Sequence, residues 1–328
     1  MTAFPKKVSI REEGPREGFQ IEPTFIPTAR KIEFIDLLGQ TGLKHIQIVS
    51  FVSPTRVPNM ADAEQVAAGI TPRAGVAYTG LSLNEKGLRR ALACKNLTVT
   101  GDIALCASEA FLKRNQNRTL EQQTAAQRTD VAQYNSLKVP VERAVVMAAF
   151  GCNFEGDVPT ARVVSLVETA TDIAAEQGVR LKKVSLADTM AWATPDRIKQ
   201  AVGAVQNRFP DLSIALHLHN TRGMGIANAY AGLEMGVTEF DACVGGLGGC
   251  PFAGHKGAAG NVCTEDLAFM CEEMGIETGL DIEKLIACAR LAEEIVGHPL
   301  PGALLSSGPL SALRDGTRPY IMASPSAY

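Results

Sequence analysis

Short runs of apolar and β-branched residues recur along the chain, at intervals typical of strands that alternate with helices. They predict eight strands, at residues 8–11, 45–50, 75–79, 98–104, 144–150, 183–187, 213–219 and 240–244. Apolar positions at helical spacing lie between them and predict helices at 29–41, 120–136, 160–177, 195–209 and 226–235. Thr194 and Pro195 suit the start of one helix, and Gly178 and Gly236 suit the ends of two others.

The order of these elements indicates the architecture. Eight β–α alternations within about 280 residues favour an α/β fold of the (β/α)8 TIM-barrel type over a doubly wound sheet. No G-x-G-x-x-G motif follows an early strand, so a dinucleotide-binding fold has no specific support. Residues 281–297 predict an extra C-terminal helix, and the Pro-, Gly- and Ser-rich stretch that follows predicts an irregular tail. We therefore expect a single domain over residues 1–328, with the barrel at about 8–280 and the added helix and tail at 281–328.

Composition and charge indicate which kinds of binding partner and which cellular location to expect. The chain has 328 residues, is 46% hydrophobic and 20% charged, and carries a net charge of −3. This balance predicts no nucleic-acid partner and no membrane partner. The N-terminus lacks the apolar run of a signal peptide, and no stretch approaches the roughly 18 apolar residues of a membrane span, so we expect a cytoplasmic protein. The 8 scattered cysteines form no C-x-x-C pair and are expected to be free thiols.

A histidine pair ends the seventh predicted strand, in the stretch ALHLHNTRG. His217 and His219 are two residues apart, and side chains at that spacing on a strand point to the same face. In a barrel they would face the interior near its C-terminal mouth, where two imidazoles can hold one divalent cation. The alternative is one core histidine and one surface histidine. The pairing at a strand end favours the metal site.

A metal needs further ligands, and the first predicted strand offers one. Glu17 follows that strand in EEGPREGFQ, and in a closed barrel the first strand lies beside the eighth and near the seventh. Two imidazoles and a carboxylate suit a catalytic Mg²⁺, Mn²⁺, Fe²⁺, Co²⁺ or Zn²⁺ with open positions. The alternative is that EEGPRE is only a charged loop.

Two further stretches carry candidate chemistry. The glycine-rich run GGLGGCPFAGHKGAAGN at 245–261 suits a lid over a substrate, with Cys250 as a proton donor or nucleophile. The alternative is a flexible loop with an inert thiol. Asp188 ends the sixth predicted strand in SLADT, where it can polarise a hydroxyl or contact a ligand, or instead cap the next helix.

Over residues 8–297 these stretches together resemble the 3-hydroxy-3-methylglutaryl-CoA (HMG-CoA) lyase family of metal-dependent TIM-barrel lyases and aldolases. The matching pieces are GPREGFQ, SFVSPTRVPNMADAEQV, ASEAFLKRNQN, FGCNFEGDV, SLADT, HLHNTRG, IANAYAGLEMGV, GLGGCPF and AAGNVCTEDL. The resemblance implies retro-Claisen cleavage of a 3-hydroxyacyl-CoA to acetyl-CoA and a keto acid. It also implies Mg²⁺ or Mn²⁺ as the cofactor and a homodimer as the assembly.

The resemblance also implies roles for particular residues. The metal ligands would be Glu17, His217, His219 and Asn261. Arg16 matches the arginine that stabilises the enolate, and Cys250 matches the loop cysteine that helps to move protons. Asp188 matches an active-site aspartate, Glu265 in TED matches a loop acid, and Gln20 at the end of GPREGFQ is a candidate substrate contact.

Several positions depart from the family pattern. Glu17 replaces an aspartate ligand, Gln47 stands where the lyases usually carry a glutamate, and Asn220 replaces an aspartate after the second histidine. The lid is also longer, with His255 and Lys256 in GHKG. These changes make the pocket less acidic, and we therefore expect a substrate related to HMG-CoA, such as a citramalyl-CoA-like or longer-chain 3-hydroxyacyl-CoA.

No replacement for the missing charge at Gln47 can be named from sequence. Glu12 and Glu13 are close enough to consider, although strand alternation lets only one of them face inward. Two other functions stay open. One is an acyl-CoA/keto-acid condensing enzyme, but those enzymes usually carry a further C-terminal domain that 328 residues do not provide. The other is a barrel without catalysis that serves binding or assembly.

Overall fold

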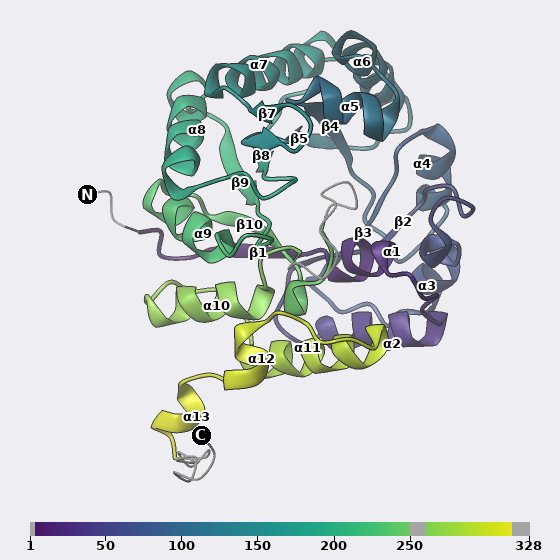
Figure 1. Cartoon of the computed structure of the whole chain (residues 1–328). Coiled ribbons are helices and arrows are strands. Elements are labelled where there is room, and N and C mark those ends of the chain that lie inside the picture. Colours follow the sequence, from purple (N-terminus) through teal and green to yellow (C-terminus); the bar gives the residue numbers. More distant parts are fainter. Residues whose placement is uncertain (1–3, 250–259, 317–328) are drawn as a thin grey trace.

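Eight parallel strands form one curled sheet, and helices surround it (Figure 1). The structure is a computed structural model that describes residues 4–249 and 260–316. The strands are β1 (Ser9–Glu12), β2 (His45–Ser50), β3 (Ala77–Leu81), β4 (Gly101–Cys106), β5 (Val141–Met147), β8 (Lys183–Ala187), β9 (Ser213–His217) and β10 (Glu239–Ala242). They pair in the order β3-β2-β1-β10-β9-β8-β5-β4, so the first strand lies beside the last. At the seam between β3 and β4, Thr98 N donates to Tyr78 O over 2.7 Å. The predicted TIM barrel is confirmed.

All eight predicted strands are present, although most of their ends differ from the predicted ones by one to three residues. β5 begins at Val141 and ends at Met147 instead of Phe150, because Ala148 takes a left-handed backbone with φ of 53°. The residues beyond it form a small antiparallel hairpin of β6 (Gly151–Cys152) and β7 (Gly156–Asp157). β9 stops at His217, two residues before the predicted end.

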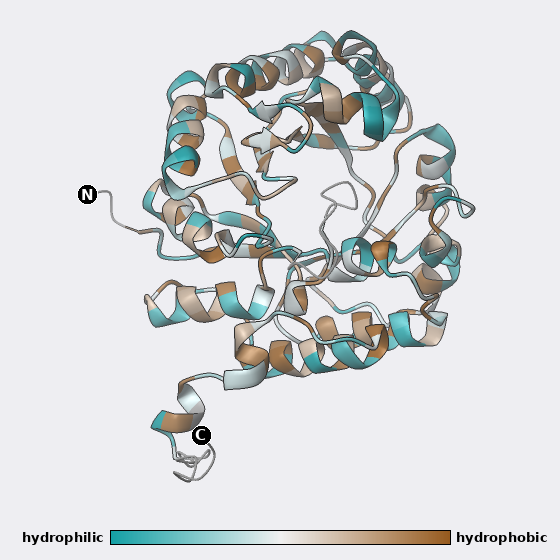
Figure 2. Ribbon diagram, in the orientation of Figure 1, coloured by the Kyte–Doolittle hydropathy of each residue, from teal (hydrophilic) through white to brown (hydrophobic). Residues whose placement is uncertain are grey.

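The helices alternate with the strands and cover the barrel. They are α2 (Thr28–Leu38), α3 (Ala63–Gly69), α4 (Glu85–Leu92), α5 (Glu109–Gln116), α6 (Leu120–Ser136), α7 (Thr160–Glu176), α8 (Pro195–Arg208), α9 (Gly225–Glu234) and α10 (Thr264–Glu273). In Figure 2 these helices carry both hydrophobic and hydrophilic residues, as expected where one face packs on a core. The start of α8 is as predicted, since Thr194 Oγ1 accepts from Arg197 N. Short elements were not predicted, including the π-helix η1 (Gly14–Gly18), α1 (Phe19–Ile21), and the 3₁₀ turns η2 (Pro58–Met60) and η3 (Val244–Gly246).

The extra C-terminal helix is also present. α11 (Ile282–Val296) begins after Asp281, whose side chain accepts from Lys284 N, and ends at Gly297 with φ of 75°. It lies beside α2 (Figure 1), to which the ion pair of Arg30 and Glu294 joins it. The prediction that the following tail is irregular is wrong for its first part, which forms α12 (Ala303–Ser307) and α13 (Ser311–Arg314).

The reason for the order in this tail is hydrogen bonding to α10. Asp266 accepts from the backbone N–H groups of Ala303 and Leu304, at 2.9 and 3.0 Å. Arg314 pairs with Glu273 over 2.8 Å. Among the described helices none is long and apolar enough to cross a membrane. The cysteines of the described part are free, as predicted for them.

Candidate active site

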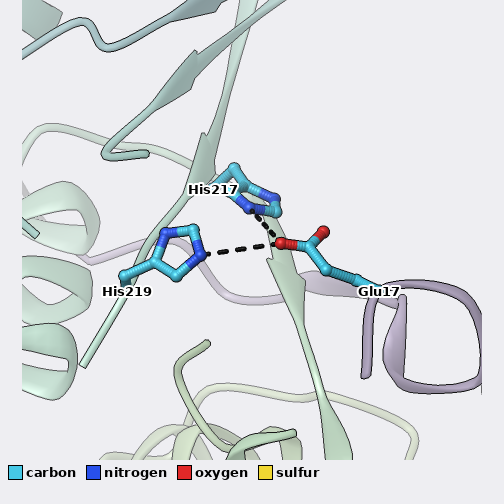
Figure 3. A group of neighbouring side chains, drawn as sticks. All are labelled: Glu17, His217 and His219. Atoms are coloured by element: carbon cyan, nitrogen blue, oxygen red, sulfur yellow. Dashed lines mark ion pairs between the residues drawn. The ribbon is translucent and has the colours of Figure 1, made fainter. Parts of the chain in front are cut away.

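Three side chains converge at the C-terminal end of the barrel, as Figure 3 shows: Glu17, His217 and His219. Glu17 Oε1 lies 3.6 Å from Nε2 of each imidazole. The two rings meet edge to face with their centroids 5.1 Å apart. All three ligand atoms fall within 4.8 Å of one another, which is the spacing of groups that can share one metal ion.

The backbone around Glu17 explains how the carboxylate reaches this place. Residues 14–18 form one turn of π-helix directly after β1, in which Glu17 N donates to Glu13 O over 2.7 Å. Gly18 packs so closely that a Cβ there would lie 2.7 Å from Leu247 Cβ. The turn therefore requires glycine after Glu17, and it aims the carboxylate inward across the mouth of the barrel.

The two histidines are held in different ways. His217 is the last residue of β9, whereas His219 lies beyond it in an isolated bridge with Asn261. The predicted strand through residue 219 is wrong because Val262 N donates to Leu218 O, which pairs this segment with the chain before α10. Side-chain alternation still holds, so both rings face the same way while Leu218 is buried on the other side.

Each imidazole is oriented through its Nδ1 atom. His219 Nδ1 is 2.9 Å from the Asp188 carbonyl oxygen, which can only accept, so Nδ1 carries the proton and Nε2 is left with its lone pair. His217 Nδ1 is 3.3 Å from Asp241 Oδ2. Burial raises the pKa of Asp241, but the hydrogen bond from His217 and the charge of Arg143 outweigh it and bring that pKa below its usual value. Such acceptors behind ligating histidines are typical of metal sites.

The residues present fit a divalent cation. His219 Nε2 and Asn261 Oδ1 are buried and have no hydrogen-bond partner among the described residues. The Asn261 amide donates from Nδ2 to Leu247 O over 3.1 Å, which leaves its oxygen available. A Cβ on Gly248 would lie 2.8 Å from Asn261 Nδ2 and 3.2 Å from Glu17 Cγ, so Asn261 and Glu17 flank the same stretch of backbone. Buried atoms with unused lone pairs beside a carboxylate call for a positive charge between them.

Glu17 and His217 form an ion pair in this cluster. Burial opposes ionisation of Glu17, but Arg16 and His217 outweigh it and hold its pKa well below the usual range. Burial likewise lowers the pKa of His217, but Glu17 and Asp241 outweigh it and raise that pKa well above its ordinary value. The proton on His217 therefore balances the Glu17 carboxylate, and a divalent cation that binds between Glu17 and the imidazoles would displace this proton.

Arg16 lies at the edge of the cluster and is mostly buried. Its Nη2 is 3.1 Å from Glu17 Oε2 and also donates to Glu13 Oε2, and its Nε donates to Gln47 Oε1. Gln47 therefore contacts the arginine through an uncharged amide, and the carboxylates beside that arginine come from Glu13 and Glu17. As strand alternation requires, Glu12 points elsewhere, and its carboxylate accepts from Val244 N and Thr264 Oγ1.

The other predicted site residues lie at different distances from the cluster. Asp188 Oδ1 accepts from Trp192 N and Ala193 N, so it holds the loop before α8, while Thr194 is the cap of that helix. Asp188 Oδ2 is buried and unpartnered within the described ranges, and burial raises the pKa of this carboxyl. Gln20 Oε1 accepts from Ser50 Oγ over 3.0 Å.

Asn220 has a local structural contact. Its Oδ1 accepts from Gly225 N over 2.9 Å at the start of α9. An amide oxygen does here what one aspartate oxygen would do, so this departure leaves the turn intact.

Glu265 is the clearest correction. We expected it in a loop, but it lies in the first turn of α10, fully buried, and both of its oxygens are 3.0 Å from Gly245 N. No described contact joins it to Glu17 or to the two histidines. Burial, with a smaller effect of Asp266, raises its pKa to about 8. Its place is under η3, the turn that leads into the glycine-rich segment. Cys250, His255 and Lys256 lie in that segment, outside the described residues.

Sequence reasoning missed one carboxylate that contacts a site residue, Asp241, and it named Glu12 and Glu13 without deciding that Glu13 is the one that faces inward. Asp241 is one of two acids in the short strand β10, and Arg11 and Glu13 alternate along β1 and beyond. Charged residues at inward positions of a barrel strand were the available signal, because such positions are usually filled by branched apolar side chains.

Comparison with known proteins agrees with the fold. The family model described as HMGL-like matches residues 7–292. The chain is 40% identical over 306 residues to the hydroxymethylglutaryl-CoA lyase YngG of Bacillus subtilis, covering 91% of this chain and 96% of that protein. It is 39% identical over 286 residues to the mitochondrial hydroxymethylglutaryl-CoA lyase of Gallus gallus, covering 87% of this chain and 92% of the relative.

Solved structures give the same result. The HMG-CoA lyase of Bacillus subtilis superposes with a TM-score of 0.86 at 38% identity, covering 93% of this chain and 99% of the other. An HMG-CoA lyase from Acinetobacter baumannii, in complex with coenzyme A and 3-methylmalate, superposes with a TM-score of 0.82 at 39% identity, covering 94% and 97%. Sequence and structure together show that this chain belongs to the HMGL-like family.

Proposed function

We propose that this protein is a divalent-metal-dependent carbon–carbon lyase that cleaves a 3-hydroxyacyl-CoA, HMG-CoA or a related substrate such as citramalyl-CoA, to acetyl-CoA and a keto acid. The observation that carries the proposal is the convergence of Glu17, His217 and His219 with Arg16 alongside. Family membership supports the reaction class, and the relative in complex with coenzyme A and 3-methylmalate supports an acyl-CoA substrate.

The metal site of the proposal consists of Glu17, His217, His219 and Asn261. Two imidazole nitrogens, a carboxylate and an amide oxygen suit Mg²⁺ or Mn²⁺, with positions left for substrate oxygens. When bound, the cation would supply electrostatic stabilisation of the negative charge that develops on substrate oxygens during cleavage.

Arg16 supplies the protein's own positive charge at this place. Retro-Claisen cleavage moves negative charge onto the thioester oxygen of the acetyl-CoA half, and a fixed guanidinium stabilises that charge in a water-poor site. The Nη1 group of Arg16 has no partner among the described residues, which leaves it to face the substrate.

Proton movement is assigned to acids at the rim. Asp188 keeps one buried oxygen unpaired, and its raised pKa suits a group that takes a proton from the substrate hydroxyl. Cys250 is proposed to return a proton to the enolate carbon. The proposed role of Glu265 is structural: it accepts from Gly245 N in η3 and so fixes the start of the segment that carries Cys250.

Two of the departures from the family pattern have local structural explanations and give little support for a changed substrate. Glu13 places a carboxylate beside Arg16 where Gln47 has none, and Asn220 keeps a local turn. The hypothesis of a substrate other than HMG-CoA therefore rests on Glu17 and on His255 and Lys256, and it stays a prediction.

A turnover assay tests the function. Purified protein is given Mg²⁺ or Mn²⁺ and a panel of 3-hydroxyacyl-CoAs that includes HMG-CoA and citramalyl-CoA, and acetyl-CoA release is followed by mass spectrometry, with His217→Ala as the control. Release from HMG-CoA shows that Glu17, Gln47 and Asn220 are tolerated. Release from another member alone supports a changed substrate. Metal binding without release from any of them contradicts the proposal and points to condensation or to a barrel without catalysis.

We also propose a single-domain cytoplasmic homodimer whose partner is the acyl-CoA substrate, with no nucleic acid and no membrane. The net charge of −3 and the family resemblance support this. Light scattering of the purified protein measures the mass of the assembly, and a monomer mass would contradict the dimer.

A further inference from the structure

A carboxylate without an assigned role contacts Arg16. Glu13 follows β1 directly, and its residue surface is only 3% exposed. One of its oxygens accepts from Arg16 Nη2, and the other lies 3.2 Å from Arg11 Nε. Glu13 therefore lies between two arginines inside the barrel, and one of these belongs to the active site.

The charge balance around Arg16 shows what this contact does. A mostly buried guanidinium needs an anionic partner, because an unpaired buried charge is costly. Among the described residues the carboxylates beside it are those of Glu13 and Glu17. Glu13 makes the closer contact, because its Oε2 accepts directly from Arg16 Nη2, whereas Glu17 Oε2 lies 3.1 Å from the same nitrogen.

Glu17 cannot supply this neutralisation without a conflict. Its Oε2 is 3.1 Å from Arg16, while its Oε1 is 3.6 Å from both imidazole nitrogens of the cluster. If Arg16 had Glu17 as its only anionic neighbour, the carboxylate would be drawn toward the guanidinium and away from His217 and His219. A second carboxylate on Arg16 removes that competition.

We propose that Glu13 is a positioning residue for Arg16: its carboxylate neutralises and orients the guanidinium, so that Glu17 stays directed at His217 and His219. The inference rests on the proposed lyase function for its kinetic consequence, and on geometry alone for its effect on metal binding.

Position 47 offers a way to test this without losing the charge. Gln47 Oε1 already accepts from Arg16 Nε, so a glutamate there would present a carboxylate oxygen to the same arginine with little change of shape. It would not replace the contact of Glu13 with Arg11. The double variant Glu13→Gln with Gln47→Glu therefore keeps a carboxylate beside Arg16 and removes the one beside Arg11. It distinguishes an effect of Glu13 on Arg16 from an effect on Arg11.

The experiment compares the wild type, Glu13→Gln, Gln47→Glu and the double variant. The matched control is Glu277→Gln, the same chemical change in an exposed ion pair with Lys7. The measurements are kcat and KM on the best acyl-CoA of the panel, Mn²⁺ affinity by titration calorimetry, and thermal unfolding.

We expect Glu13→Gln to lower kcat about 10- to 100-fold and to weaken Mn²⁺ binding about tenfold, as is typical when a group that orients a metal ligand is lost. We expect the double variant to return both to within about threefold of the wild type, and the control to leave them unchanged.

Other results overturn the inference. An unchanged Glu13→Gln shows that Arg16 does not need this partner, and a loss that the double variant fails to reverse assigns the effect to Arg11 or to the fold. If Glu13→Gln does not fold, the double variant decides: a folded, metal-binding double supports the proposal, and an unfolded one overturns it. A wild type without turnover on the panel contradicts the proposed function, whereas the Mn²⁺ titrations still test Glu13.

Discussion

At the scale of single residues, the site is set by what lies behind each ligand. The Asp188 carbonyl accepts from Nδ1 of His219, and the Asp241 carboxylate accepts from Nδ1 of His217. Each ring is therefore oriented with its Nε2 toward Glu17. A backbone carbonyl accepts a proton whatever the side chain, whereas a carboxylate adds charge and raises the basicity of its imidazole. The two histidines therefore differ in their supporting acceptor. The basicity of His217 can be changed by substituting the side chain that accepts from its Nδ1, whereas the acceptor of His219 is a backbone carbonyl.

Asp241→Asn tests this inequality. The amide oxygen can still accept from His217 Nδ1, but the negative charge is lost and Arg143 keeps one partner fewer. We expect Mn²⁺ affinity to fall about 10- to 100-fold, with the fold retained. Titration calorimetry measures it, and Asp211→Asn, which removes a charge from an exposed ion pair with Arg180, is the control. An affinity equal to that of the wild type would show that Asp241 does not act through His217.

The glutamate at position 17 gives a second test at this scale. The π-helical turn places its Oε1 equally far from both imidazoles, 3.6 Å in each case. Glu17→Asp restores the residue usual in the related lyases, but it withdraws the carboxylate by about one ångström, a displacement that can cost up to about 100-fold. We expect weaker Mn²⁺ binding and a lower kcat, because this backbone suits the longer side chain. Tighter binding by Glu17→Asp would mean that glutamate is a poor substitute here.

At the scale of elements, two buried acids support the turn η3. Glu12 at the end of β1 accepts from Val244 N, and Glu265 at the start of α10 accepts from Gly245 N. Burial raises the pKa of Glu12 to about 7 and that of Glu265 to about 8. The strand and the helix are therefore joined through the backbone of the segment that leads to the glycine-rich run. Near neutral pH Glu265 is mostly protonated, and Glu12 is about half protonated.

These raised pKa values predict a pH dependence of stability. In the unfolded chain both acids have a pKa near 4.5. Between that pH and their folded-state pKa values, the folded protein therefore binds more protons than the unfolded chain. Their stabilisation is complete below pH 4.5 and is lost as pH rises through about 7 and then about 8. For each group, the free energy of unfolding should fall by at most about 1.4 kcal/mol per pH unit between pH 4.5 and the folded-state pKa of that group.

Urea unfolding of the wild type and of Glu265→Gln between about pH 6.5 and 8.5 isolates the contribution of Glu265, because histidines such as His217, whose pKa is raised, add the same slope to both proteins. We expect Glu265→Gln to make the slope shallower and Glu277→Gln to leave it unchanged. A Glu265→Gln variant with the slope of the wild type would show that Glu265 is ionised in the folded protein.

At the scale of the whole molecule, periodicity predicts the barrel because each strand–helix unit carries its own pattern. The ends are less predictable, since they depend on partners far away in the chain. β9 stops at His217 because Leu218 pairs with Val262, and the tail forms α12 because Asp266 accepts its first N–H groups. The pair His217 and His219 is visible in sequence because two residues are one strand repeat. Asp241 was missed because its partner His217 lies on the neighbouring strand β9, and the choice between Glu12 and Glu13 stayed open because the turn that brings Arg16 back to Glu13 was not predicted.

The site also joins parts of the chain that are far apart in sequence, which gives a prediction for the molecule as a whole. Glu17 comes from the first turn after β1, and His217, His219 and Asn261 come from segments some two hundred residues later. A cation bound by all four would stabilise the folded chain and not the unfolded one, since only folding brings these ligands together. At a free concentration of 100 times Kd the gain is about 2.7 kcal/mol, or roughly 4 °C in Tm for a chain of this length. Differential scanning calorimetry with Mn²⁺ and with EDTA measures it. His217→Ala should abolish the shift, whereas Asp211→Asn should retain it. A wild-type Tm that does not respond to Mn²⁺ or Mg²⁺ would show that the four side chains do not form a metal site.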